Sequence, residues 1–183
     1  MHGTEAPSDW VRRWTPLIPA AGVVLDVACG AGRHLHWLRE SGYSVVGVDQ
    51  SEPALEACAG LGELVCADIE NGPWPLMSRQ FAGVVVTNYL WRPLWPTLLD
   101  SIAPGGVLIY ETFAAGNETV GRPARADFLL QPGELLRVCA GLRVVGYEDG
   151  FLDDPARFVQ RIAAVRELPQ AAAPQRYSLP VRG

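Results

Sequence analysis

The stretch Val23-Val24-Leu25-Asp26-Val27-Ala28-Cys29-Gly30-Ala31-Gly32-Arg33-His34-Leu35 decides how this chain folds. It joins an apolar β-branched run to a glycine-containing turn and then to the start of a helix. Glycine at 30 and 32 lets the backbone turn tightly and come close to a ligand, while the free N–H groups of the helix face the same crevice. The stretch predicts a ligand-binding strand-to-helix turn, and the competing interpretation is a tight turn that only packs the strand on the helix.

Short apolar runs alternate with helical patterns along the rest of the chain. We expect strands at 23–28, 44–49, 63–67, 81–88 and 106–113, and helices at 32–40, 51–61, 93–101 and 132–140. Two further strands, at 142–147 and 158–165, are joined by a short acidic segment, which favours an antiparallel pair at the sheet edge. The predicted fold is therefore an α/β, doubly wound Rossmann-like sheet of seven strands, mostly parallel, with an antiparallel C-terminal pair.

Capping signals and composition suggest the limits of the domain. Ser51 is expected to cap its helix, and Pro132 is expected in the first turn of another. We expect residues 1–167 to form one domain, in which 1–20 form an N-terminal helix or lid with Ser8 as the cap. Residues 168–183, with repeated Pro, Ala and Gln, are expected to be a flexible tail.

Composition narrows the class of partner. The 183 residues carry a formal charge of -5, and all fifteen basic residues are arginine, a bias typical of GC-rich bacterial genomes. An acidic chain offers no general electrostatic attraction to nucleic acid or to an anionic membrane, and no apolar run is long enough to span a bilayer. Four widely spaced cysteines and a start without a secretory pattern predict a reduced, cytoplasmic protein. A short, acidic chain without an accessory domain favours a small-molecule substrate.

Two acids and one leucine discriminate between cofactors. Asp26, just before the glycine turn, would repel a pyrophosphate but could accept a hydrogen bond from an ammonium group. Leu35 stands where the dinucleotide-binding motif has its third small residue. Asp49 ends the next strand, where such folds hold ribose hydroxyls, although it could also serve as a helix cap. Adenosylmethionine therefore fits better than NAD, which remains the alternative.

The motif series Leu25-Asp26-Val27-Ala28-Cys29-Gly30-Ala31-Gly32, Val48-Asp49, Ala67-Asp68-Ile69 and Ala103-Pro104-Gly105-Gly106 resembles that of class I S-adenosylmethionine-dependent methyltransferases. The resemblance implies that Asp68 accepts from the adenine amine, that the Ile69 backbone addresses the ring, and that Asn88 lies beside the methionine moiety. The cofactor contacts it implies are Asp26, Ala28, Gly30, Gly32, Asp49, Gln50, Asp68, Ile69 and Asn88. The fourth strand departs from the family, because Phe81-Ala82 replaces the usual aromatic-acid pair.

A narrower resemblance, to small bacterial stand-alone methyltransferases related to the tellurite-resistance type, rests on Tyr110-Glu111-Thr112-Phe113 and the loop that follows. Tyr89 and Glu111 are candidate catalytic residues, although both residue types at such positions also serve structural roles. Substrate candidates are Trp10, Arg92 and Arg122. His34 and His36 point to different helix faces without a completing ligand, so we expect no metal site and treat both as surface or partly packed histidines.

Three functions stay open from the sequence. The first is methyl transfer to an unidentified, small-molecule acceptor by direct in-line displacement. The second is NAD(P)-dependent oxidoreduction, which the same glycine turn and ribose acid would suit. The third is a non-catalytic module that binds S-adenosylmethionine, suggested by the lack of an identifiable general base.

Overall fold

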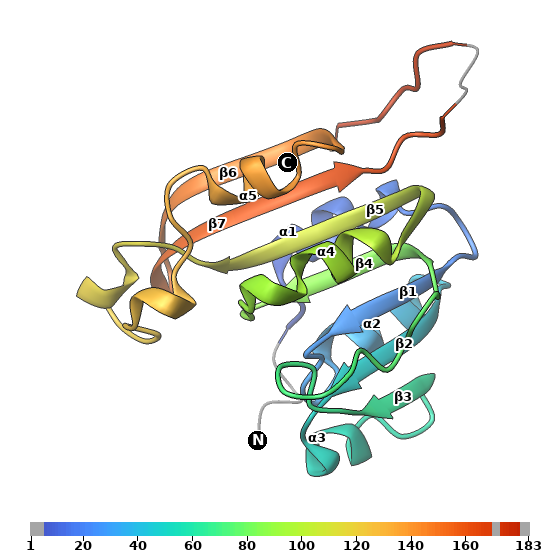
Figure 1. The fold of residues 1–183 in the computed structure, drawn as a ribbon, viewed down its shortest axis with the longest axis horizontal. Coiled ribbons are helices and arrows are strands. Elements are labelled where there is room, and N and C mark those ends of the chain that lie inside the picture. The colour runs from blue at the N-terminus through green and yellow to red at the C-terminus, as the bar shows by residue number, and fades with distance from the viewer. Residues whose placement is uncertain (1–5, 170–172, 180–183) are drawn as a thin grey trace.

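A seven-stranded sheet forms the centre of the computed structural model, which describes residues 6–169 and 173–179 (Figure 1). The strand order is β3-β2-β1-β4-β5-β7-β6. The strands are β1 (Val23–Val27), β2 (Ser44–Asp49), β3 (Glu63–Cys66), β4 (Phe81–Thr87), β5 (Ile102–Phe113), β6 (Arg143–Asp153) and β7 (Ala156–Val165). The first five are parallel, and β7 runs antiparallel to both β5 and β6, which confirms the predicted fold class.

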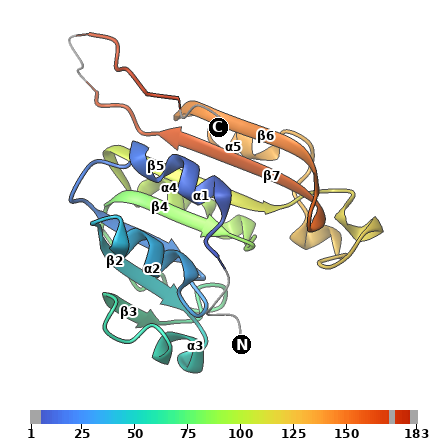
Figure 2. The same ribbon diagram turned by 180° about the vertical axis from the view of Figure 1, so that it is seen from behind.

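Helices cover both faces of the sheet, as Figures 1 and 2 show from opposite sides. They are α1 (Asp9–Trp14), α2 (Arg33–Glu40), α3 (Glu52–Glu56), α4 (Trp95–Asp100) and α5 (Glu134–Val138), with short 3-10 turns η1 (Thr15–Leu17), η2 (Arg92–Leu94), η3 (Asn117–Thr119) and η4 (Ala126–Phe128). Apolar side chains of α1, α2 and α3 pack on one face, and those of α4 and α5 on the other. Burial of the central strands on both sides explains why β1 is apolar at every position except Asp26.

Two predicted helices differ in extent. The helix expected at 51–61 ends at Glu56, although Ser51 caps it as expected by accepting from the Ala54 N–H at 3.4 Å. The helix expected at 132–140 begins only at Glu134. Gly133 precedes it with φ +68°, a left-handed conformation, so Pro132 lies outside the helix and the expectation that it sits in the first turn was wrong.

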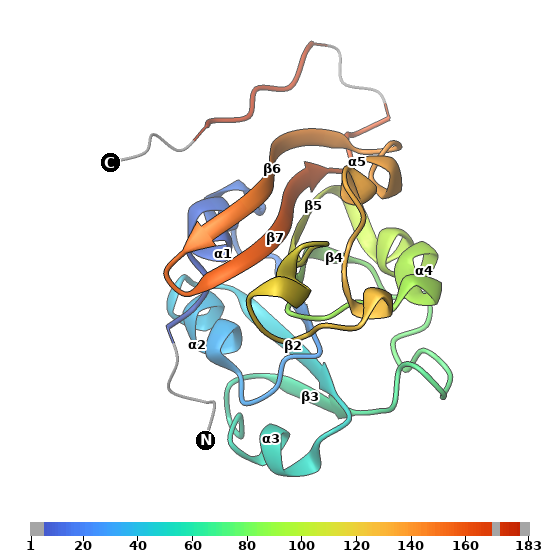
Figure 3. The same ribbon diagram turned by 90° about the vertical axis from the view of Figure 1, so that its left-hand side faces the viewer.

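The order of the strands determines where a ligand can bind. From β1 to β3 each strand is added next to the previous one toward one edge of the sheet. The chain then crosses over, and β4 pairs with the other side of β1. Ligands of open α/β sheets bind at such a reversal, outside the carboxyl ends of the strands. Figure 3 shows the sheet viewed from these carboxyl ends, and the segment that carries η3 and η4 projects beyond them.

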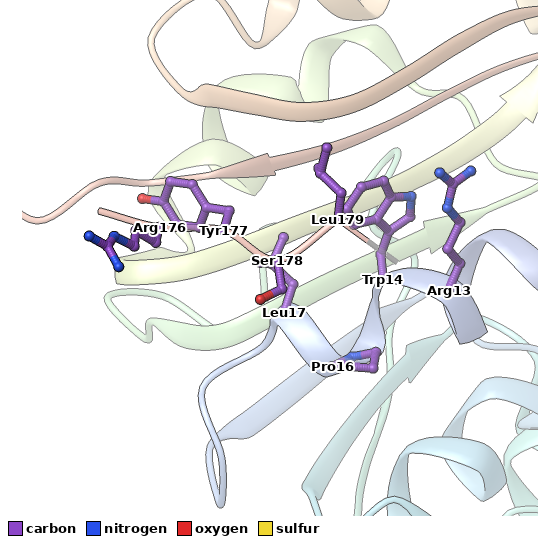
Figure 4. A pocket seen from close by; sticks show the side chains of 8 residues that line it. All are labelled: Arg13, Trp14, Pro16, Leu17, Arg176, Tyr177, Ser178 and Leu179. Carbon is purple, nitrogen blue, oxygen red and sulfur yellow. The ribbon is translucent and has the colours of Figure 1, made fainter. Parts of the chain in front are cut away.

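The first described helix and the last described segment are not part of the strands and their crossovers. The expected N-terminal helix is present as α1, and the Ser8 hydroxyl caps it by accepting from the Trp10 N–H at 3.1 Å. A pocket of about 480 Å³ separates α1 and η1 from residues 176–179 (Figure 4). None of its lining residues follows a parallel strand, so it does not belong to the edge where the motifs converge. Among the described helices, none is long and apolar enough to cross a membrane.

Candidate active site

The glycine turn after β1 adopts the sharp backbone conformation that the sequence predicts. Ala28, Gly30 and Gly32 all have positive φ angles, of 53°, 53° and 80°. A Cβ atom at Gly32 would lie 2.6 Å from the Sγ atom of Cys58, whereas one at Gly30 would meet nothing within 4 Å. Gly32 is therefore required both for its conformation and for close packing, while Gly30 is required for its conformation and leaves open space beside the backbone.

Asp26 is a buried acid without hydrogen-bond partners. Its side chain is 1% exposed, and neither carboxylate oxygen accepts a hydrogen bond from the described residues. Burial raises the pKa of Asp26 to about 8; Arg33 opposes this rise and Asp49 adds to it. A buried carboxylate is costly unless it is paired, so this position is suited to a cationic ligand group that the free protein lacks.

Asp49, at the end of β2, is held by two backbone N–H groups. The Gly30 N–H donates to Oδ2 and the Ser51 N–H to Oδ1, both at 2.8 Å. The second bond closes a local turn before Ser51, which is itself the N-cap of α3, and the first ties the acid directly to the glycine turn. An ionised carboxylate has about four acceptor positions, so two remain for ligand hydroxyls.

A pocket of about 90 Å³ lies at the carboxyl ends of β1, β2, β3 and β4. It is lined by Ala28, Asp49, Gln50, Ala67, Asp68, Ile69, Glu70 and Tyr89. We call it the nucleoside pocket. Five of the predicted cofactor residues meet in it although they come from three separate turns. The Asp68 carboxylate accepts from the Asn71 side-chain amide at 2.9 Å and from the Asn71 and Glu70 N–H groups, each at 3.0 Å, and these bonds fix its orientation and lower its pKa.

Three other predicted site residues, Asn88, Trp10 and Arg122, do not line this pocket. Asn88 is exposed, with φ +54°, and does not line it. The Trp10 indole is 2% exposed and donates to the Ile162 carbonyl at 3.1 Å, so it belongs to the core. Arg122 is exposed in the loop that contains η3 and η4.

Glu111 is buried in a polar network that links β5 to the N-terminal helix. Its carboxylate accepts from the Ser8 hydroxyl at 2.9 Å and from Arg161 Nη1 at 3.1 Å. His34 also contacts Ser8 and is only 2% exposed, so the expectation of a surface or partly packed histidine was wrong. The partners of His34 are 26 and 53 residues away in sequence, which local patterns do not reveal.

A second hollow, of about 300 Å³, adjoins the nucleoside pocket, because Glu70 lines both. Its other lining residues are Leu90, Trp91, Arg92, Pro93, Arg125, Asp127 and Phe128. We call it the acceptor groove. Arg92 cross-links the wall of this groove. Its guanidinium pairs with Glu134 at 2.7 Å and donates to the Asp127 and Leu129 carbonyls. No group of three or more metal-binding side chains occurs in the described part of the chain.

Comparisons with known proteins agree with this geometry. A family model described as a methyltransferase domain matches residues 24–105. A thiopurine S-methyltransferase of Pseudomonas syringae is 40% identical over 57 residues, which are 31% of this chain and 26% of that protein. Residues 24–105, which carry the glycine turn and the acids that end β2 and follow β3, match the methyltransferase domain family.

Two solved structures share the fold of this chain. TehB from Haemophilus influenzae superposes with a TM-score of 0.74 at 19% identity, covering 91% of this chain and 64% of that one. The glycopeptide N-methyltransferase MtfA, solved with sinefungin, gives a TM-score of 0.60 at 20% identity and covers 88% and 93%. The chain thus spans about a quarter of the thiopurine methyltransferase relative and about two thirds of TehB.

Proposed function

We propose that this chain transfers a methyl group from S-adenosylmethionine to a small, flat acceptor molecule. The observation that carries the proposal is the Asp26 carboxylate, buried and unpartnered directly before the glycine turn. An ammonium group is the ligand chemistry that would satisfy it, and S-adenosylmethionine carries one on its amino-acid tail. NAD has no such group, and its pyrophosphate would be repelled by this acid.

The remaining residues fit the other parts of the cofactor. Asp49 has free acceptor positions for ribose hydroxyls, and its bond to the Gly30 N–H keeps ribose and tail subsites in a fixed relation. Asp68 and Ile69 line the far side of the nucleoside pocket, where an adenine edge would find an acceptor and a backbone. Leu35 is fully buried and fills the space that a dinucleotide-binding turn would leave for close helix packing.

Catalysis would depend on positioning. The bound cofactor supplies a methyl group already activated by its sulfonium, and aligning a nucleophile with it can account for roughly 7–11 kcal/mol of barrier reduction in favourable systems. The candidate bases are unsuited to proton abstraction: Glu111 is engaged by Ser8 and Arg161. Burial, with the nearby Glu70 carboxylate, raises the pKa of Tyr89, which keeps its phenol protonated. The acceptor should therefore be a good nucleophile by itself and lose its proton to water.

The acceptor groove indicates the shape of that molecule. Its charged side chains are largely neutralised by one another, because Arg92 pairs with Glu134 and Arg125 pairs with Asp127 at 3.0 Å. The rest of the wall includes the flat surfaces of Trp91 and Phe128. Aromatic walls favour planar ligands. Aromatic thiols combine planarity with nucleophilicity, and the similarity to a thiopurine S-methyltransferase supports the same class.

Calorimetry and a transfer assay test the proposal. The protein should bind S-adenosylhomocysteine, and Asp49→Ala should weaken binding at least about tenfold, since it removes the anchor of the Gly30 N–H and a charged acceptor. Labelled S-adenosylmethionine should then methylate aromatic thiols faster than matched phenols or anilines. Binding of NADH in place of S-adenosylhomocysteine would favour an oxidoreductase, and cofactor binding without transfer to any acceptor in a lysate would favour a binding module.

A further inference from the structure

His34 occupies a buried position between the N-terminal helix and Asp26. The Ser8 N–H donates to its Nε2 atom at 3.1 Å. Its Nδ1 atom lies 3.4 Å from Thr87 Oγ1 and 4.0 Å from Asp26 Oδ2. Burial, assisted by Arg33, lowers the pKa of His34 to about 3, so the ring is neutral at physiological pH. Because Nε2 accepts a hydrogen bond, the single ring proton must be on Nδ1, which faces Thr87 and Asp26.

Ser8 connects this imidazole to a second buried group. Its hydroxyl donates to Glu111 Oε1 at 2.9 Å, and Glu111 is itself held by Arg161. The same hydroxyl caps α1 by accepting from the Trp10 N–H. The start of α1 is thus attached at two points, to α2 through His34 and to β5 through Glu111, immediately beside the carboxyl end of β1.

We propose, building on the methyltransferase function above, that His34 is a positioning residue that couples docking of the start of α1 to binding of the cofactor's ammonium group at Asp26. An ammonium ligand requires Asp26 in its charged form, and the Nδ1–H of His34 is a donor placed to stabilise that charge. A charged Asp26 in turn favours the Nδ1–H tautomer, which leaves Nε2 free to accept from Ser8. Each event therefore favours the other, as linkage requires.

The proton balance gives this coupling a pH signature. In the free protein at neutral pH Asp26 is mostly protonated, and pairing with an ammonium group releases that proton to solvent. The groups that face Asp26 are His34 and Arg33 from α2, Asp49 from β2, and the thiols of Cys29 and Cys58. Removal of the His34 donor leaves the charged form of Asp26 with less support, so binding should need a higher pH.

Two conservative variants separate the two sides of the ring. His34→Asn places an amide near the Nδ1 position, which keeps a donor toward Asp26 but does not reach Ser8. His34→Gln extends an acceptor toward Ser8 but has no donor at the Nδ1 position. His36→Gln, on an exposed face of the same helix two residues later, is the matched control.

Calorimetric titration with S-adenosylhomocysteine across pH 6 to 9 provides the first readout. We expect His34→Gln to weaken binding about tenfold at pH 7 and to move the pH midpoint upward, and His34→Asn to stay within about threefold of the wild type with the midpoint unchanged. A merely structural role would lower the melting temperature of both variants without separating their midpoints. Equal affinities and midpoints in wild type and His34→Gln would overturn the proposal.

Hydrogen exchange provides the second readout. S-adenosylhomocysteine should slow amide exchange across residues 8–14 in the wild type and in His36→Gln, but not in His34→Asn, which binds the ligand without the Ser8 link. Ser8→Pro, which removes the N–H that donates to His34 Nε2, should lose part of this protection relative to Ser8→Ala, which keeps that N–H, even if the His34 variants fail to fold. Equal protection in Ser8→Pro and Ser8→Ala would overturn the coupling. No binding by the wild type would overturn the proposed function as well, so the two failures are distinguishable.

Discussion

Replacing Asp26 by asparagine should stabilise the cofactor-free protein at neutral pH while it removes tight cofactor binding. An aspartate in an unfolded chain has a pKa of about 3.9. Burial raises the pKa of Asp26 in the folded protein to about 8. The folded state therefore holds the proton more tightly than the unfolded state. The free energy of unfolding is highest below about pH 4 and falls as the pH rises to about 8.

The size of this effect follows from the pKa difference. Each unit corresponds to about 1.4 kcal/mol, so ionisation in the unfolded state lowers the stability by about 4 kcal/mol at pH 7 and by about 6 kcal/mol above pH 8. Asparagine has nearly the same shape and does not titrate in this range. The advantage of Asp26→Asn over the wild type should therefore grow with pH by these amounts.

Urea unfolding between pH 5 and 8.5 measures the difference, and Asp9→Asn provides a control because the Asp9 side chain is 93% exposed. S-adenosylhomocysteine should raise the stability of the wild type and of the control but not that of Asp26→Asn. Parallel pH profiles for the wild type and Asp26→Asn would refute the assignment of a costly buried carboxyl at this position.

Three further substitutions test other parts of the structure. Gly32→Ala should destabilise the protein by roughly 2 kcal/mol or more in urea titrations, because it adds a contact with Cys58 to an unfavourable φ, whereas Gly30→Ala should cost only about 1 kcal/mol. Arg92→Lys should raise the acceptor KM by about three- to tenfold with cofactor affinity nearly unchanged, as steady-state kinetics and calorimetry would show. Trp10→Phe should lower the free energy of unfolding by about 1–3 kcal/mol, because it leaves a buried carbonyl without its donor.

The convergence of the predicted cofactor residues at one edge of the sheet was predictable, because each of them ends or follows a strand that its own sequence indicates. Asp26, Asp49 and Asp68 each stand at or just after the end of an apolar run, and parallel strands bring such ends to one edge. Ser8 and Glu111 are 103 residues apart, and no local pattern indicates that they meet. The irregular register of β6 has a similar cause, since a Cβ on Gly146 would lie 2.2 Å from the Trp14 ring of a helix far away in sequence.

Lengths of elements were harder to predict than their order. The pattern at 51–61 continues to look helical after Glu56, but the residues that follow form turns as the chain approaches Gly60 and Gly62. At Gly62, a Cβ would lie 2.3 Å from the Val45 carbonyl oxygen, so the chain enters β3 by passing close to β2. Tertiary contact, rather than helix propensity, fixes that boundary.

The two hollows that share Glu70 draw their walls from different parts of the chain. Every residue of the nucleoside pocket lies between 28 and 89, whereas the acceptor groove takes part of its wall from residues 125–128, beyond the segment that matches the methyltransferase family model. Selection can therefore alter the recognition of the acceptor through a loop that contributes nothing to the nucleoside pocket. Related proteins can therefore change their substrate while they keep the same methyl donor.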